Sequence, residues 1–160
     1  MASKQKITTF LWFDNNAQEA MEFYTSVFKN SKIGNVSRYG EAGPGANGTV
    51  MVGSFELEGQ QFTALNGGPR FKFSEAISLV INCETQEEVD YFWEKLSAGG
   101  QLQQCGWLKD KFGLSWQVVP TVLDELMRDK DPQKSKRVME AMLQMVKLDI
   151  PRLRAAYEGR

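Results

Sequence analysis

The first 65 residues place apolar and polar residues in a pattern that predicts one strand, one helix and three further strands. Residues 7–13 are β-branched and aromatic and end at a polar Asp-Asn pair, which is typical of a strand. From Asn16 onward the apolar residues recur at helical spacing, so we expect a helix with one apolar face. Three more strand-like runs lie at about 33–39, 49–57 and 60–65, and Gly53 suggests a bulge in the second of them.

The same order of elements begins again after the Asn-Gly-Gly-Pro breaker at 66–69. Residues 76–82 predict a strand, and Thr85 with Glu88 three positions later is a helix start signal. Strands at about 101–109 and 114–119 then complete the second copy.

The two predicted helices keep one constant spacing. Asn16 and Thr85 are 69 residues apart (85 − 16 = 69), and Glu19 and Glu88 differ by the same number. A fixed spacing between start signals indicates an internal repeat. The sequence therefore predicts an α+β fold made of two tandem βαβββ modules.

The composition changes at residue 121, and the last forty residues predict only helices. Asp131 with Pro132, and Asp149 with Pro151, are each typical of a helix start. We interpret this segment as an appendage whose Met-rich face packs against the sheet or a partner subunit. We therefore expect one domain over 1–160, with a first module at 1–69, a second at 70–120 and a helical tail at 121–160.

Aromatic and polar residues alternate in a predicted hairpin at 105–120, which turns at 111–113. Such alternation is typical of strands with one face on a pocket, so we expect this hairpin to line any site. Cys105, at its start, has no histidine to activate it, and we expect it to be a partly buried, inert thiol.

The charge balance and the absence of histidine exclude several classes of function. Nineteen basic and twenty acidic side chains give a net charge of −1, which offers no field for nucleic acid or acidic lipid. No apolar run is long enough to span a membrane, and we expect a cytoplasmic protein. With no histidine there is no Ser-His-Asp triad, no Cys-His pair and no histidine metal ligand within the chain.

One further motif invites a functional interpretation. Residues 43–48 match G-x-G-x-x-G, but a β-branched run follows them instead of the helix that a dinucleotide site needs. We expect a hairpin loop there. The acidic pairs at 56/58 and 87/88 are expected to be solvated.

Four segments resemble one family, the PhnB-like group, whose usual name is 3-demethylubiquinone-9 3-methyltransferase-like. The group belongs to the vicinal oxygen chelate superfamily (glyoxalase/bleomycin resistance/dioxygenase). The resemblance rests on residues 8–14 with 20–24, 81–90, 105–117 and 137–142. It implies two βαβββ modules whose sheets curl around a shared, glyoxalase-like cleft, and assembly as a homodimer.

Metal-dependent members of that superfamily place metal ligands on the first and last strands of each module. By resemblance these positions fall at Thr8, near Thr63, at Ala76 or Ile77, and at Gln117. None of them is an imidazole or a carboxylate, and neutral groups hold divalent ions poorly. We therefore expect no metal, no other cofactor, and no glyoxalase or extradiol dioxygenase chemistry.

Two functions remain open from the sequence. The first is a binding protein that holds a planar or aromatic small molecule in a cleft between the modules. The second is a metal-independent enzyme acting on a small or quinone-like substrate, although the glycine-rich turn of adenosyl-methionine enzymes is absent. The expected ligand-binding residues are aromatic with a few polar groups: Thr8, Phe10, Trp12, Thr63, Cys105, Trp107 and Gln117.

Overall fold

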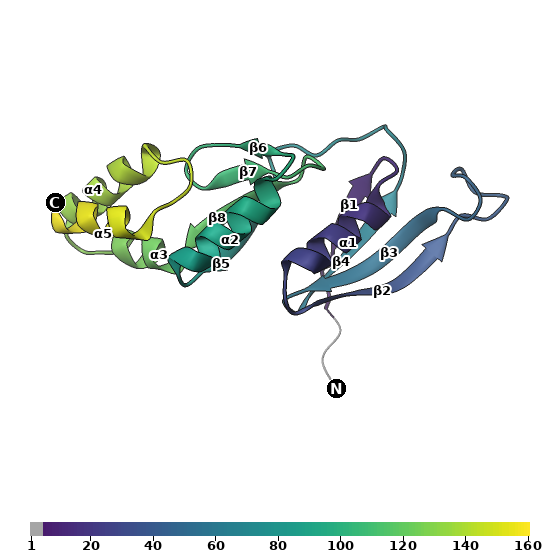
Figure 1. The fold of residues 1–160 in the computed structure, drawn as a ribbon, viewed down its shortest axis with the longest axis horizontal. Helices are drawn as coiled ribbons and strands as arrows, with labels where there is room; N and C mark the ends of the chain where they lie inside the picture. The colour runs from purple at the N-terminus through teal and green to yellow at the C-terminus, as the bar shows by residue number, and fades with distance from the viewer. Residues whose placement is uncertain (1–4) are drawn as a thin grey trace. The chain divides into compact units, whose positions relative to one another are not determined.

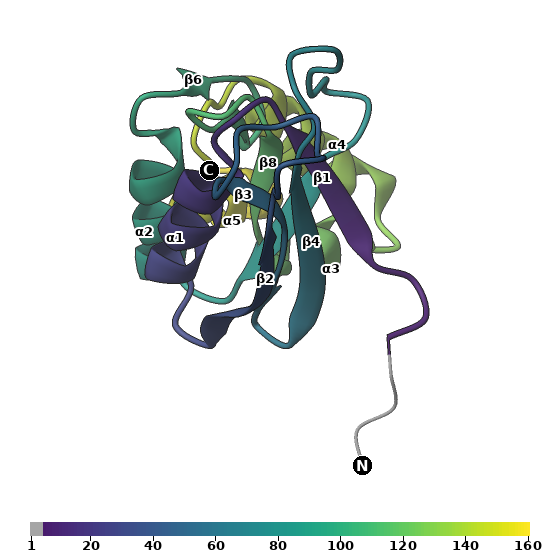
Figure 2. The ribbon, with the colours of Figure 1, turned by 90° about the vertical axis from the view of Figure 1, so that its right-hand side faces the viewer.

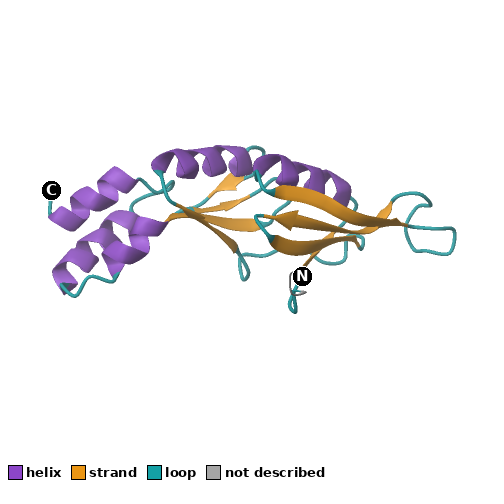
Figure 3. Ribbon diagram, turned by 90° about the horizontal axis from the view of Figure 1, so that it is seen from below, coloured by secondary structure: helices purple, strands orange, loops and turns teal. Residues whose placement is uncertain are grey.

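The computed structural model describes residues 5–160, and the chain divides into two compact units. The first unit ends at Phe73, and the second runs from Ser74 to Arg160. Each unit contains one four-stranded sheet with a helix over one of its faces (Figures 1 and 3). Two βαβββ modules followed by a helical tail are thus confirmed.

The first unit is a mixed sheet covered by α1, as the purple and blue part of Figure 2 shows. The strand order is β1-β4-β3-β2, with β1 parallel to β4 and the other pairs antiparallel. The elements are β1 (Thr9–Phe13), α1 (Ala17–Val27), β2 (Ser31–Arg38), β3 (Val50–Leu57) and β4 (Gln60–Asn66).

The core of this unit lies between α1 and the sheet. The ring of Tyr24 on α1 stacks on Phe55 of β3 at 6.1 Å between centroids, and Phe55 stacks on Phe62 of β4 at 5.2 Å. The expected bulge at Gly53 is wrong, because the irregular pairing of β2 and β3 lies on either side of it. Gly53 is needed for packing instead, since a Cβ there would lie 2.7 Å from Cε of Met21 on α1.

The second unit repeats this sheet and adds the tail. Its strand order is β5-β8-β7-β6, with β5 parallel to β8 and the remaining pairs antiparallel. The elements are β5 (Leu79–Cys83), α2 (Gln86–Ser97), β6 (Gln101–Leu102), β7 (Trp107–Lys109), β8 (Ser115–Pro120), α3 (Thr121–Met127), α4 (Pro132–Leu143) and α5 (Ile150–Glu158).

Two strands of the second unit differ from the prediction. The strand expected at 76–82 begins only at Leu79, after a turn and a bend. The strand expected at 101–109 is broken into β6 and β7, because Cys105 and Gly106 both adopt left-handed backbone angles, with φ of 60° and 84°.

The tail has a small apolar core of its own. Val138 of α4, Leu148 of the following linker and Leu153 of α5 are completely buried, together with Met145. The predicted helix starts are present, since the carboxylates of Asp131 and Asp149 accept hydrogen bonds from backbone amides of α4 and α5. Among residues 5–160, no helix combines the length and the apolar character needed to span a bilayer.

Candidate functional site

The strand register shows which positions of the two sheets are equivalent. Phe10 of β1 is paired with Thr63 of β4, and Val80 of β5 is paired with Gln117 of β8. Thr63 and Gln117 are therefore equivalent, as are Phe10 and Val80. Two residues earlier, immediately before each first strand, the counterpart of Thr8 is Ser78.

This register corrects the expected first-strand position of the second module. Neither Ala76 nor Ile77 is equivalent to Thr8, because the chain turns at 75–77 before β5 begins. Sequence comparison missed Ser78, since the loops before the two first strands differ. The equivalence of Ser78 and Thr8 follows from the parallel pairing of β5 with β8, and this pairing is known only from the folded sheet.

Ser78, immediately before β5, and Gln117 of β8 are joined by a hydrogen bond. The Nε2 of Gln117 donates to Oγ of Ser78 at 2.9 Å, and both side chains are half-buried. The partner of the Gln117 amide thus lies within the same unit. The two positions thus hold a neutral hydroxyl bonded to a neutral amide.

In the first unit, the sheet face opposite α1 carries a hollow of about 340 Å³. Three hydroxyl-bearing residues line it, namely Thr8, Ser54 and Thr63, together with Gln5, Gln61 and Phe62. Phe10, the strand partner of Thr63, lies on the same face and is 57% exposed. The structure therefore brings Thr8, Phe10 and Thr63 together.

Trp12 is on the same face but is engaged in holding the linker after β4. Its Nε1 donates to the carbonyl oxygen of Gly68 at 2.9 Å, and its ring meets Phe71 edge-on at 4.9 Å. A Cβ at Gly67 would lie 2.4 Å from the indole ring. The indole donor of Trp12 is accordingly bonded within the chain.

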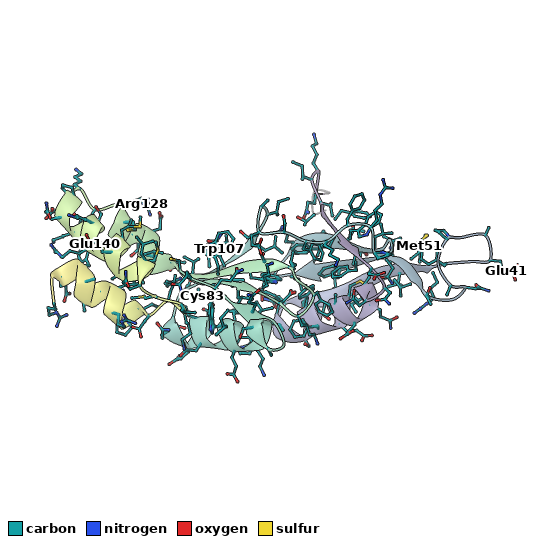
Figure 4. All side chains as sticks on the ribbon, turned by 90° about the horizontal axis from the view of Figure 1, so that it is seen from above. Glu41, Met51, Cys83, Trp107, Arg128 and Glu140 are labelled. Atoms are coloured by element: carbon teal, nitrogen blue, oxygen red, sulfur yellow. The ribbon has the colours of Figure 1, made fainter. Side chains whose placement is uncertain are left out.

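In the second unit, Trp107 of β7 and Gln117 of β8 are direct register partners. Trp107, labelled in Figure 4, is half-buried on the sheet face away from α2, whereas its neighbour Leu108 is fully buried under the helix. Cys105 lies just before this pair, in the bend that separates β6 from β7. These three predicted residues lie within one hairpin region.

Asp110 is used to build the hairpin turn and is not available as an acid or base. Its Oδ1 accepts from the amides of Phe112 and Leu114 at 2.9 and 3.1 Å, and its Oδ2 accepts from Nε1 of Trp116 at 2.9 Å. The residue is 2% exposed. These bonds make it an anchor for the turn at 111–113.

Lys109 is paired with a carboxylate that the sequence did not single out. Its Nζ contacts Oε1 of Glu75, and this hydrogen bond holds the pKa of the Glu75 carboxyl below its ordinary value. The side-chain nitrogen of Lys109 is therefore engaged by a carboxylate of the same unit.

Neither the glycine-rich loop nor Cys83 adds a reactive group. Gly43 and Gly45 pack on the ring of Tyr39, where a Cβ would come within 2.7 and 2.3 Å, and Tyr39 donates to the carbonyl of Asn66 at 2.6 Å. The hairpin loop expected at 43–48 is confirmed between β2 and β3, with Glu41 of Figure 4 in the same connection. Burial raises the pKa of the Cys83 thiol to about 12, so it remains protonated.

The positions that the resemblance assigns to metal ligands do not fit a divalent ion. They are Thr8 and Thr63 in the first unit, and Ser78 and Gln117 in the second, and in each unit these neutral groups carry no charge to offset that of an ion. Across residues 5–160, no three side chains of His, Cys, Asp or Glu gather in a group that could hold a metal.

Two sheets of order β1-β4-β3-β2 and β5-β8-β7-β6, each with a helix on one face, are the βαβββ modules of the vicinal oxygen chelate superfamily. Within it, the model of the 3-demethylubiquinone-9 3-methyltransferase family matches residues 5–119, and the chain belongs to this family. The match ends just before the helical tail.

Solved structures agree with this assignment. A PhnB protein from Bacillus cereus, which carries the 3-demethylubiquinone-9 3-methyltransferase name, is 44% identical, with a TM-score of 0.69. The alignment covers 73% of this chain and 100% of that one. A search among curated proteins found no match.

Two more distant structures share the fold. A protein from Pseudomonas aeruginosa is 19% identical over 73% of this chain and 98% of its own, with a TM-score of 0.62. The fosfomycin resistance protein FosX from Listeria monocytogenes, in complex with Mn(II) and sulfate, is 16% identical over 80% of this chain and 98% of its own, with a TM-score of 0.54.

Proposed function

We propose that the protein is a metal-independent, small-molecule-binding member of the PhnB-like group, and that it holds a planar or aromatic ligand. The proposed ligand-binding residues are those on the sheet faces away from the helices: Thr8, Phe10, Trp12, Thr63, Cys105, Trp107 and Gln117. We further propose that it acts as a homodimer in the cytoplasm, without a cofactor.

The hydrogen bond between Ser78 and Gln117 is the observation that carries this proposal. It joins two neutral groups at positions that, by resemblance, hold charged ligands in metal-dependent members of the superfamily, and it engages the amide of Gln117. Thr8 and Thr63 extend the same neutral chemistry to the first sheet. Uncharged hydroxyl and amide groups beside exposed aromatic rings suit an uncharged aromatic ligand with one or two polar atoms.

Binding is tested with two uncharged probes, the fluorescent N-phenyl-1-naphthylamine and the fully substituted quinone duroquinone. We expect saturable fluorescence and an upward shift of the melting temperature, because a ligand of the native state stabilises it. Phe10→Ala should weaken binding of both probes. Tyr91→Ala removes a 37% exposed ring on α2 and serves as the matched control. Equal affinities in the two variants would refute the role of Phe10.

The role of neutral side chains at positions 78 and 117 is tested by replacing them with metal-binding side chains. The double variant Ser78→His with Gln117→Glu places an imidazole and a carboxylate on neighbouring strands, and we expect it to gain Zn²⁺ or Mn²⁺ binding by calorimetry. The double variant Ser78→Ala with Gln117→Ala is the control. Stoichiometric metal in the desalted native protein would contradict a metal-independent function.

The alternative is a metal-independent enzyme acting on a small or quinone-like substrate. The methyltransferase name of the family supports this alternative. The carboxylate of Asp110 is bonded within the turn and the Cys83 thiol is buried, which leaves Cys105 and Lys109 as candidate reactive groups. Adenosyl-methionine is the discriminating probe. Tight binding of it, with methyl transfer to a quinol, would replace the binding-protein proposal.

A further inference from the structure

We infer that the helical tail, residues 121–160, positions the hairpin that carries Trp107 and Gln117, and that Gln86 is the positioning residue through which it does so. This inference rests on the proposed function, because it concerns how one wall of the proposed ligand site is held. The tail lies beyond residue 119, where the family match ends, so it is an addition to what the family model describes.

The tail bonds directly to the bend from which Trp107 emerges. The amide of Cys105 donates to the carbonyl of Met145 at 2.9 Å, and the amide of Gly106 donates to the carbonyl of Val146 at 2.8 Å. Cys105 has a left-handed backbone, which is strained for a residue other than glycine. External bonds are therefore needed to hold this bend in one conformation.

The contact between bend and tail is too close for a side chain at Gly106. A Cβ there would lie 3.0 Å from Cδ1 of Leu148 and 2.9 Å from the carbonyl oxygen of Val118 on β8. Leu148 is itself fully buried in the core of the tail. The bend is thus packed between β8 and the linker that joins α4 to α5.

Gln86, in the first turn of α2, holds that linker in place. Its Nε2 donates to the carbonyl of Leu148 at 3.1 Å, and its Oε1 accepts from the amide of Ile150 at 2.7 Å. One turn further along α2, Asp90 accepts from the Nε2 of Gln86 and forms an ion pair with Lys147 at 2.7 Å. One amide therefore engages both a donor and an acceptor of the linker.

The internal repeat supplies an independent comparison. Since Asn16 and Thr85 are equivalent helix starts, the counterpart of Gln86 in the first module is Ala17. That module is not followed by a helical tail, and Ala17 carries no side-chain amide. A long polar side chain is present at this position only in the module whose helix contacts the tail.

The test uses the full-length protein and the thiol of Cys105 as a local reporter. Gln86→Met keeps the side-chain length but removes both hydrogen bonds to the linker. Gln18→Met is the control, because Gln18 lies in the first turn of α1 and its side chain bonds to Glu22 on its own helix. Labelling by 5,5′-dithiobis(2-nitrobenzoate) is followed by mass spectrometry at Cys105, with buried Cys83 as the internal reference.

We expect Gln86→Met to speed the labelling of Cys105 roughly tenfold, because each lost hydrogen bond makes local opening several-fold easier. Cys83 and the Gln18→Met variant should label as in the native protein. Gln86→Glu retains the acceptor for Ile150 but loses the donor to Leu148, and an intermediate rate is expected. Gln86→Glu also takes the place of Gln86→Met in the labelling assay if Gln86→Met folds poorly. The affinity for N-phenyl-1-naphthylamine should fall about threefold in Gln86→Met.

An unchanged rate at Cys105 in Gln86→Met would overturn the inference. So would a parallel rise at Cys83, because that result would mean general destabilisation of the unit. The labelling assay needs no ligand. If the native protein binds neither probe, the proposed function fails, while the labelling rates still decide whether Gln86 and the tail hold the hairpin.

Discussion

Asp110→Asn tests whether the hairpin depends on a buried carboxylate. The two carboxylate oxygens accept three hydrogen bonds: Oδ1 from the amides of Phe112 and Leu114, and Oδ2 from the indole of Trp116. Asparagine has the same shape but only one acceptor oxygen. If that oxygen faces the two amides, the new NH₂ group points its hydrogens at the indole N–H.

The magnitude follows from these contacts. Loss of one hydrogen bond to a charged acceptor costs about 1.5–3 kcal/mol, and the facing donors add to this. A neutral amide is less costly to bury than a carboxylate, which offsets part of the loss. We therefore expect the free energy of unfolding to fall by about 2–3 kcal/mol in Asp110→Asn.

The assay is equilibrium unfolding in urea, followed by tryptophan fluorescence. Asp124→Asn is the control, because Asp124 lies in the same unit with a 72% exposed side chain and an ion pair to Arg128. Exposed pairs of this kind contribute little, so the control should change stability by less than about 0.5 kcal/mol. Equal stability of the two variants would refute the assigned role of Asp110.

Two further predictions concern the same unit. Ser115 is completely buried and its hydroxyl has no hydrogen-bond partner among residues 5–160, so Ser115→Ala should raise the free energy of unfolding by about 1 kcal/mol in calorimetry. A loss of stability would show that the hydroxyl is bonded. Hydrogen bonds from Lys147, and then from Gln86, hold the pKa of Asp90 below its ordinary value, so Lys147→Gln should raise this pKa in an NMR titration. Because the pKa of Asp90 is lower in the native than in the unfolded protein, the pair stabilises the native protein fully above the unfolded-state pKa. This stabilisation is lost as the pH falls through the native-state pKa of Asp90. An unchanged pKa in Lys147→Gln would contradict the pairing.

Local signals in the sequence were sufficient for the elements and their repeat. Thr85 accepts a hydrogen bond from the amide of Glu88 at 3.1 Å, as its helix start signal predicted. The first helix begins after Asn16 as expected, but the side chain that bonds its first amide is that of Asn66, at the end of β4. The position of a helix start is a local property, whereas its bonding partner depends on the fold.

The candidate site was less accessible to sequence reasoning because its residues meet through strand pairing. Ser78 could not be matched to Thr8 until the register of β5 and β8 was known. Trp12 was expected to contact a ligand, and the structure adds that its indole N–H donates to the carbonyl oxygen of Gly68. The turn contacts of Asp110 depend on where the indole of Trp116 lies. Each difference arises from contacts between residues on different strands or loops.

The two sheets also differ on the faces away from their helices. Toward the helices, equivalent buried positions are apolar in both units, such as Phe62 in the first unit and Trp116 in the second. On the opposite faces, Thr63 corresponds to Gln117. Packing against a helix favours apolar residues at a core position, whereas an open face has no such limit. On one open face, the neutral bond between Ser78 and Gln117 supports the uncharged ligand that we propose over a metal ion.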